Sequence, residues 1–363
     1  MAEGRVKMPD KAETTAARRE GAHAAGTRGD APAGPAAASA VPGRAAVAAA
    51  PAGYGVRGSA RKAAAARDAA LGPVNWARPP EGSCRLAFEV PSGRLAALEL
   101  GPADGVPVVL VPGVMGSKED FALVLPRLAA AGYRALSFDM AGQYESAAAG
   151  PERLDPPGRR YDLRLFVDDL LAVLERTGPA HVTGYSFAGV VAQAALVLRP
   201  DLFRSLTLLS CPPVPGQSLA RVRWIGWLSP LVGRRLSAAL IVWGVRRNFV
   251  PAPPDRLAFV ERRFARTRRS SIADIVGLMK AVPDLRRALR NAPVPLFVAV
   301  GGSDVWPLAL HRGFARSIGA RIGIYRTGHS PCENSPNLLS LDLLRLFAAS
   351  ASAPGPHPSC PES

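Results

Sequence analysis

The clearest chemical signal in this chain is a serine placed where a strand-like run gives way to a helical pattern. The segment reads His181-Val182-Thr183-Gly184-Tyr185-Ser186-Phe187-Ala188-Gly189. A serine on a sharp strand-to-helix turn needs small neighbours two positions away, because the two backbones nearly touch there. Gly184 and Ala188 meet that need, and such a serine can attack a carbonyl carbon from a helix N-terminus. The simpler alternative is a turn serine that only caps the helix.

The elements that would hold this serine alternate between short apolar runs and amphipathic stretches. The periodicity predicts strands at Arg85–Val90, Arg94–Leu100, Val108–Val111, Tyr133–Phe138, His181–Gly184, Leu206–Leu209, Pro295–Val300 and Ala320–Tyr325. It predicts helices at Phe121–Ala131, Leu163–Leu174, Val190–Leu198, Leu308–Ile318 and Leu338–Phe347. The first two strands are joined by Pro91-Ser92-Gly93 as a hairpin. We therefore predict an α/β fold with a mostly parallel central sheet that is flanked by helices on both faces.

From about Cys84 to Phe347 the chain resembles the α/β-hydrolase fold, in its serine-hydrolase form with a helical cap. After the third predicted strand comes Val111-Pro112-Gly113-Val114-Met115-Gly116-Ser117. This family places its oxyanion loop there, and Pro112 stands where most members have histidine. The oxyanion donors are backbone N–H groups, so the change does not remove them. The resemblance implies that Val114 and Phe187 supply the two donors.

The resemblance also implies a catalytic triad of Ser186, Asp304 and His329. His329 lies in the loop after the last predicted strand, where the family has its catalytic base. Asp304 follows the preceding strand, and no carboxylate follows Leu206–Leu209 until Asp255. The order Ser, Asp, His along the chain is the order this fold uses. Members that open epoxides or remove halides use a carboxylate nucleophile, so a serine in that slot argues against those reactions.

Another carboxylate, Asp139, follows the fourth predicted strand and is, with Glu145, an alternative candidate for the catalytic acid. The family has an Asp-x-x-Gly-x-x-x-Ser turn at this place, and the sequence contains it as Asp139 to Ser146. We interpret Asp139 as a turn-forming residue. Glu145 has nothing that distinguishes it from a solvated loop acid.

Residues 213–291 lack strand-like runs, are rich in Arg and Trp, and fit the place where this fold inserts its cap. We expect helices there, apolar on the face toward the substrate. The predicted substrate pocket contains Met115, Trp306, Trp224 and Trp227. A basic rim would favour an anionic or lipid-like substrate, and Trp with Arg could give weak contact with an anionic membrane surface. A solvated basic face in an Arg-rich chain is an equal alternative.

The ends of the chain differ from its middle. We predict a disordered tail rich in Ala, Gly, Pro and Arg at residues 1–72, with a frayed helix in the Ala-rich stretch before Leu71. The hydrolase domain is predicted at 84–348 and a second disordered tail at 349–363. The first tail is expected to be dispensable for folding. Arg18-Arg19 is a twin-Arg pair without the apolar run of an export signal, so a cytoplasmic location is predicted, with export as the alternative.

Composition narrows the possible functions. The chain has 363 residues, 45 basic and 29 acidic side chains, and four scattered cysteines. We predict no disulfide framework, no metal and no cofactor. The leading hypothesis is a serine hydrolase acting on a small-molecule ester or acyl substrate. Alternatives are a cofactor-free haloperoxidase or perhydrolase, and a binding protein on a hydrolase scaffold. The net charge of +16 alone does not support a nucleic-acid partner. Substrate identity and oligomeric state are not predicted.

Overall fold

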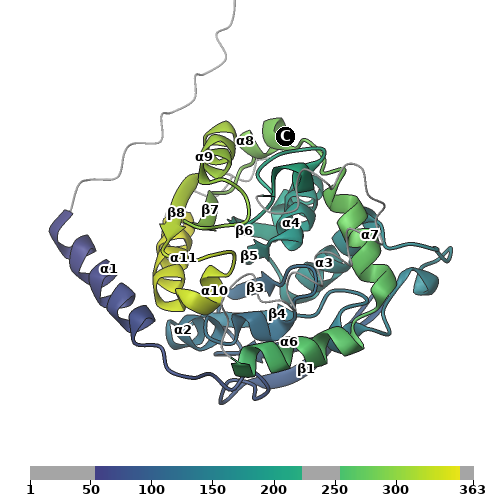
Figure 1. Ribbon diagram of the computed structural model, residues 1–363, viewed down its shortest axis with the longest axis horizontal. Helices are drawn as coiled ribbons and strands as arrows, with labels where there is room; N and C mark the ends of the chain where they lie inside the picture. The colour runs from purple at the N-terminus through teal and green to yellow at the C-terminus, as the bar shows by residue number, and fades with distance from the viewer. Residues whose placement is uncertain (1–53, 223–253, 352–363) are drawn as a thin grey trace, which may run out of the picture. The chain divides into compact units, whose positions relative to one another are not determined.

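The computed structural model describes residues 54–222 and 254–351, and its centre is one eight-stranded sheet. The strand order is β1-β2-β4-β3-β5-β6-β7-β8. Figure 1 labels these strands, except β2, from β1 at the bottom to β8 at the upper left. Strands β1 and β2 form an antiparallel hairpin, β2 pairs antiparallel with β4, and all later pairs are parallel. The bounds are β1 Cys84–Val90, β2 Gly93–Leu100, β3 Pro107–Val111, β4 Arg134–Phe138, β5 Ala180–Tyr185, β6 Phe203–Leu209, β7 Leu296–Gly301 and β8 Arg321–Tyr325. The predicted fold class is confirmed.

Helices cover both faces of the sheet, because the central strands are apolar on both sides. In β3, Val109 and Val111 pack into one core with α3 (Leu163–Thr177), α4 (Phe187–Leu198) and α9 (Leu308–Ser317). Val108 and Leu110 of the same strand pack into a second core with α2 (Leu125–Ala130) and α11 (Pro336–Ala351). Alternate residues of a strand point to opposite faces, so an unbroken apolar run predicts that helices cover both faces of the sheet.

The stretch between β6 and β7, residues 213–291, is called the insert from here on. Its described part contains α6 (Pro254–Arg266), α7 (Arg269–Met279) and α8 (Arg286–Arg290), in agreement with the expected helices. In Figure 1 these helices are green, and α6 and α7 follow one another along the chain. Trp224 and Trp227 lie outside the described residues. Within the described ranges, no helix is both long and apolar enough to cross a membrane.

The predicted disorder of residues 1–72 is wrong for Tyr54–Ala69, which form helix α1 where only a frayed helix before Leu71 was expected. This helix packs on α11, and the side chain of Ala64 is fully buried. Arg61 Nη1 lies 2.6 Å from Asp342 Oδ1. The Asp68 carboxylate accepts hydrogen bonds from the backbone N–H groups of Asn337 (2.8 Å) and Leu338 (3.1 Å). Asp68 therefore caps the N-terminus of α11, whose first amides would otherwise lack acceptors.

We expect Asp68→Ala to lower the free energy of unfolding by about 1 kcal/mol, the typical loss of a helix-capping side chain. Urea denaturation followed by circular dichroism measures the change. Asp104→Ala is the matched control, because Asp104 is an exposed loop acid and its removal should change stability far less. Equal stability of the Asp68 and Asp104 variants would contradict the proposed capping of α11.

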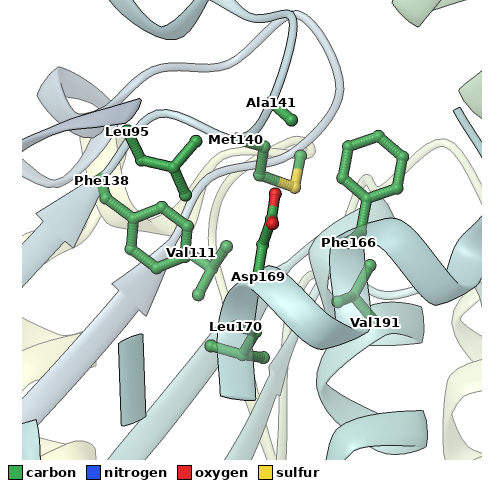
Figure 2. Close-up of a pocket in the computed structure, with 9 residues that line it drawn as sticks. All are labelled: Leu95, Val111, Phe138, Met140, Ala141, Phe166, Asp169, Leu170 and Val191. Carbon is green, nitrogen blue, oxygen red and sulfur yellow. The ribbon is translucent and has the colours of Figure 1, made fainter. Parts of the chain in front are cut away.

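A small apolar cavity lies between the sheet and helices α3 and α4, and one carboxylate projects into it (Figure 2). The carboxylate is that of Asp169, which is 2% exposed and surrounded by side chains such as Met140, Phe166 and Val191. It accepts hydrogen bonds from the backbone N–H (3.1 Å) and the hydroxyl (2.6 Å) of Ser92 in the β1–β2 turn. Burial raises the pKa of Asp169 to about 7, against the lowering effect of the Ser92 donors.

Asp169 should therefore make stability depend on pH. An ordinary aspartate has a pKa of about 3.9, so the folded state holds this proton more tightly than the unfolded state. The stabilisation is fully present below about pH 4 and is lost as pH rises through about 7. We expect the unfolding free energy of the wild type to fall by about 2–3 kcal/mol relative to Asp169→Asn between pH 5 and pH 8. Parallel pH profiles of the two proteins in denaturant titrations would refute this.

Candidate active site

Ser186 occupies the turn between β5 and α4 with a strained backbone. Its φ is 53° and its ψ −119°, a conformation that non-glycine residues rarely adopt. The small neighbours are required by close approach: a Cβ on Gly184 would lie 2.5 Å from the carbonyl oxygen of Ala188. The Ser186 N–H donates to the Leu209 carbonyl at 2.8 Å, which ties the turn to β6. Strain of this kind is found where the surrounding structure holds a functional side chain in place.

The structure brings Ser186, His329 and Asp304 together from three separate loops. The Oγ of Ser186 lies 3.1 Å from Nε2 of His329. Nδ1 of the same imidazole lies 2.8 Å from Oδ1 of Asp304. A carboxylate can only accept, so Nδ1 carries the proton and Nε2 is free to accept from the serine. The three residues named from the sequence thus form one continuous hydrogen-bonded chain.

The loop that carries His329 approaches the end of β7 through a glycine. A Cβ on Gly301 would lie 1.8 Å from the carbonyl oxygen of Gly328, so only glycine allows the two segments to lie this close. The N–H of Ser303 donates to the Thr327 carbonyl at 3.0 Å. This contact sets the separation between the loop of Asp304 and the loop of His329.

Two aromatic rings flank the His329 imidazole. The ring centroids of Tyr185 and Trp306 lie 5.3 Å and 5.7 Å from it. The Tyr185 hydroxyl is 2.8 Å from the hydroxyl of Ser330, the residue after the histidine. Trp306 is 2% exposed, and its Nε1 donates to the Ser218 carbonyl at 2.9 Å. Trp306 therefore supports the histidine, while its predicted place in a substrate pocket stays a prediction, as does that of Met115.

A second histidine lies behind the carboxylate. His311 of α9 is fully buried, and its Nε2 is 3.6 Å from Oδ2 of Asp304, which is beyond hydrogen-bond distance. Burial lowers the pKa of His311 to about 4, although Asp304 works in the opposite direction. His311 is therefore neutral at pH 7, and it does not compete with His329 as a cation beside Asp304.

The predicted oxyanion loop lies directly over the serine. A Cβ on Gly113 would be 3.0 Å from Cβ of Ser186, so glycine allows this approach without displacing the serine. Among the described residues, the backbone N–H groups of Val114 and Phe187 have no protein acceptor, which leaves both able to bind a ligand oxygen. The next amide, that of Met115, donates instead to Oε1 of Gln143 at 2.9 Å. The loop turns at Met115 with a φ of 60°.

A buried ionic cluster lies at the end of the same loop. Lys118 is fully buried, and its ammonium lies 3.0 Å from Asp139, 3.1 Å from Glu119 and 2.7 Å from Glu145. Burial disfavours the ammonium, but these carboxylates outweigh it and raise the pKa of Lys118. Asp139 also accepts from the Lys118 backbone N–H at 2.7 Å, which agrees with its interpretation as a turn-forming residue.

A neighbouring carboxylate joins the insert to this region. Asp120 is 2.6 Å from both Arg256 and Arg263 of α6, and Arg256 also binds Glu333 of α10 (Pro331–Asn334) at 2.6 Å. Burial works against the charge, yet Arg263 and Arg256 lower the pKa of Asp120. Part of the basic charge of the insert is thus neutralised by Asp120 and Glu333, which limits the predicted basic rim.

Sequence reasoning missed three polar residues at this site: His311, Gln143 and Lys118. Only the position of His311 indicates that it lies near the site, because it follows Asp304 by seven residues, near the start of a predicted helix. Gln143 and Lys118 follow no motif that reveals their contacts. Across residues 54–222 and 254–351, no group of three or more His, Cys, Asp and Glu side chains is arranged to hold a metal ion.

Comparison with known proteins identifies the family of the chain. The model of the alpha/beta hydrolase family matches residues 108–339. A thermophilic esterase from Thermogutta terrifontis has a similar solved structure, with a TM-score of 0.59 and 21% sequence identity. The alignment covers 74% of this chain and 99% of the esterase. At this identity the likeness concerns the fold alone.

Curated relatives match over a shorter part of the chain. The dihydrolipoyllysine-residue acetyltransferase component of the acetoin cleaving system of Pseudomonas putida is 32% identical over 132 residues, which is 36% of this chain. Bifunctional epoxide hydrolase 2 of Sus scrofa is 29% identical over 127 residues, or 34% of this chain. These alignments span 33% and 21% of the length of the two relatives.

Proposed function

Because the chain belongs to the alpha/beta hydrolase family, we propose that it is a serine hydrolase that cleaves an ester, thioester or related carbonyl bond. The observation that carries the proposal is the continuous chain from Ser186 Oγ to His329 (3.1 Å) to Asp304 (2.8 Å). A hydroxyl with an adjacent base, and a base oriented by a carboxylate, is the arrangement that makes serine a nucleophile.

In the first half of the proposed reaction, Ser186 attacks the substrate carbonyl while Nε2 of His329 takes its proton. Asp304 stabilises the imidazolium that forms. His329 then gives the proton to the departing alcohol or thiol, which leaves an acyl group on Ser186. In the second half, water gives a proton to His329 and attacks the acyl carbon. The bond between the acyl carbon and Ser186 Oγ then breaks, His329 returns the proton to Oγ, and the acid is released.

The negative oxygen that forms in each half needs hydrogen-bond donors. We propose that the free amides of Val114 and Phe187 supply them. Phe187 opens α4, so the positive end of the helix dipole adds to its effect. A donor of this kind typically contributes about 100–1,000-fold to the rate.

The name of the pig relative raises epoxide hydrolysis as an alternative, and the chemistry of serine argues against it. Attack on an epoxide carbon by a carboxylate gives an ester, which water can hydrolyse. Attack by Ser186 would give an ether, which has no carbonyl for water to attack, and the enzyme would be blocked after one cycle. The serine at the turn therefore favours carbonyl substrates.

The test is a panel of p-nitrophenyl esters from acetate to laurate, together with labelling by a fluorophosphonate probe. We expect ester turnover without added metal, halide or peroxide, and we expect mass spectrometry to place the label on Ser186. A requirement for halide and peroxide would instead indicate haloperoxidase chemistry. No turnover of any ester and no labelling would refute the proposal.

A further inference from the structure

Gln143 connects the oxyanion loop to the insert. It lies in the turn after β4, where its side chain is fully buried. Its Oε1 accepts from the Met115 N–H at 2.9 Å, and its Nε2 donates to Oγ of Ser271 in α7 at 2.6 Å. The Ser271 hydroxyl in turn donates to the Ala141 carbonyl at 3.2 Å. Each donor in this series of hydrogen bonds faces an acceptor, so the orientation of the Gln143 side-chain amide is defined by its partners.

The oxyanion loop needs such a hold, because its backbone is strained. Met115 has a φ of 60°, which costs free energy for a residue with a side chain. Its peptide adjoins the one that carries the Val114 N–H. A Cβ on the following Gly116 would lie 2.6 Å from the Asp120 carboxylate and 2.7 Å from the Gly113 carbonyl, so the backbone of the loop is closely packed there.

The insert holds the other end of the connection by more than one contact. The Arg268 N–H donates to the Gly142 carbonyl at 2.9 Å, and Thr267 Oγ1 accepts from the Tyr144 N–H at 3.1 Å. Gly142 has a φ of +76°, and a Cβ there would lie 2.7 Å from the side chain of Ser271. The start of α7 and the turn around Gln143 therefore form one hydrogen-bonded unit.

We propose that Gln143 is a positioning residue through which helix α7 of the insert sets the geometry of the oxyanion loop. The position of the insert then influences the chemical step. This inference rests on the proposed serine-hydrolase function. A displacement of a catalytic group by about 1 Å can cost roughly 100-fold in rate, so a loosened loop lowers kcat.

Two variants test the two ends of the connection. Gln143→Met keeps the side-chain volume and removes both hydrogen bonds. Ser271→Ala removes only the contact from the insert. We expect kcat to fall by about 10–100-fold in the first and by about 3–10-fold in the second, with KM nearly unchanged. The kcat of the double variant should be no lower than that of Gln143→Met, because both changes remove hydrogen bonds from the same Met115–Gln143–Ser271 connection.

A boronic acid distinguishes positioning from a general loss of stability. It forms a tetrahedral anion on the serine, and its oxygen needs the same donors as the transition state. Its inhibition constant should rise by the same factor as kcat/KM falls. Ser340→Ala is the matched control, because Ser340 is a buried serine of α11 away from this path. It should change neither value, whatever its effect on the melting temperature.

Hydrogen exchange provides a measurement that does not depend on activity. Amides of residues 113–116 should exchange faster in Gln143→Met and in Ser271→Ala, and at the wild-type rate in Ser340→Ala. Unchanged exchange in both site variants would overturn the inference, even if the wild type proved inactive. An active wild type whose variants keep kcat and boronate affinity would overturn it too. Failure of the proposed function would appear separately, as no ester turnover and no probe labelling in the wild type.

Discussion

Ser186→Ala is expected to lower ester turnover by about a million-fold and to abolish fluorophosphonate labelling. Removal of the nucleophile in a comparable triad has a cost of that order, because the remaining members cannot act without it. Steady-state hydrolysis of the best p-nitrophenyl ester measures the loss. The folded state should not suffer, since alanine removes a single oxygen from a residue that is 5% exposed.

Ser210→Ala is the matched control for this change. Ser210 directly follows the neighbouring strand β6, is fully buried and also has a positive φ of 44°. Its hydroxyl has no hydrogen-bond partner among the described residues. Its replacement should leave labelling intact. If Ser186→Ala kept more than a small fraction of wild-type turnover, Ser186 could not be the nucleophile.

Asp304→Asn is expected to lower turnover by about 10,000-fold, as in a comparable triad. Oδ1 of Asp304 accepts from both His329 and the N–H of Val305, and its charge stabilises the imidazolium. Asparagine keeps the shape, but it has no charge and only one accepting oxygen. Comparison of kcat in Asp304→Asn, His329→Ala and the double variant measures the effect. The double variant should be about as inactive as either single one.

Glu145→Gln serves as the comparison, because it tests the alternative acid after β4. Glu145 binds Lys118 at 2.7 Å, and its side chain is 27% exposed. Its replacement should weaken the ionic cluster under the oxyanion loop and retain far more turnover than Asp304→Asn. A loss of turnover in Glu145→Gln with activity retained in Asp304→Asn would show that the acid comes from the loop after β4.

Much of the fold and the three residues of the candidate triad were predictable from short segments. The doubly covered strands follow from unbroken apolar runs such as Val108–Val111. The turn at Ser186 follows from Gly184 and Ala188, because the close approach that excludes larger side chains occurs within five consecutive residues. The loop positions of Asp304 and His329 follow from the order of strands and from the resemblance to a known fold.

The Ala-rich stretch before β1 was misjudged because its order depends on residues far away in the chain. Nothing within Tyr54–Ala69 indicates a buried face, and its helix is stable against α11 through Arg61 and Asp68. The partners Asp342 and Asn337 are separated from them by 281 and 269 residues. The composition of a segment indicates how much apolar surface the segment itself can bury. It does not show whether a distant helix packs against that segment.

The sequence alone therefore determined which residues could do chemistry and on which elements they lie. The tertiary structure decided how those residues are supported. The contacts of Gln143 with Met115 and Ser271, and of Lys118 with three carboxylates, join segments that are distant in the chain. A hydrogen bond or an ion pair of this kind depends on distances of a few ångströms between separately folded elements. Local periodicity and spacing carry no information about such distances, so only the assembled fold could reveal them.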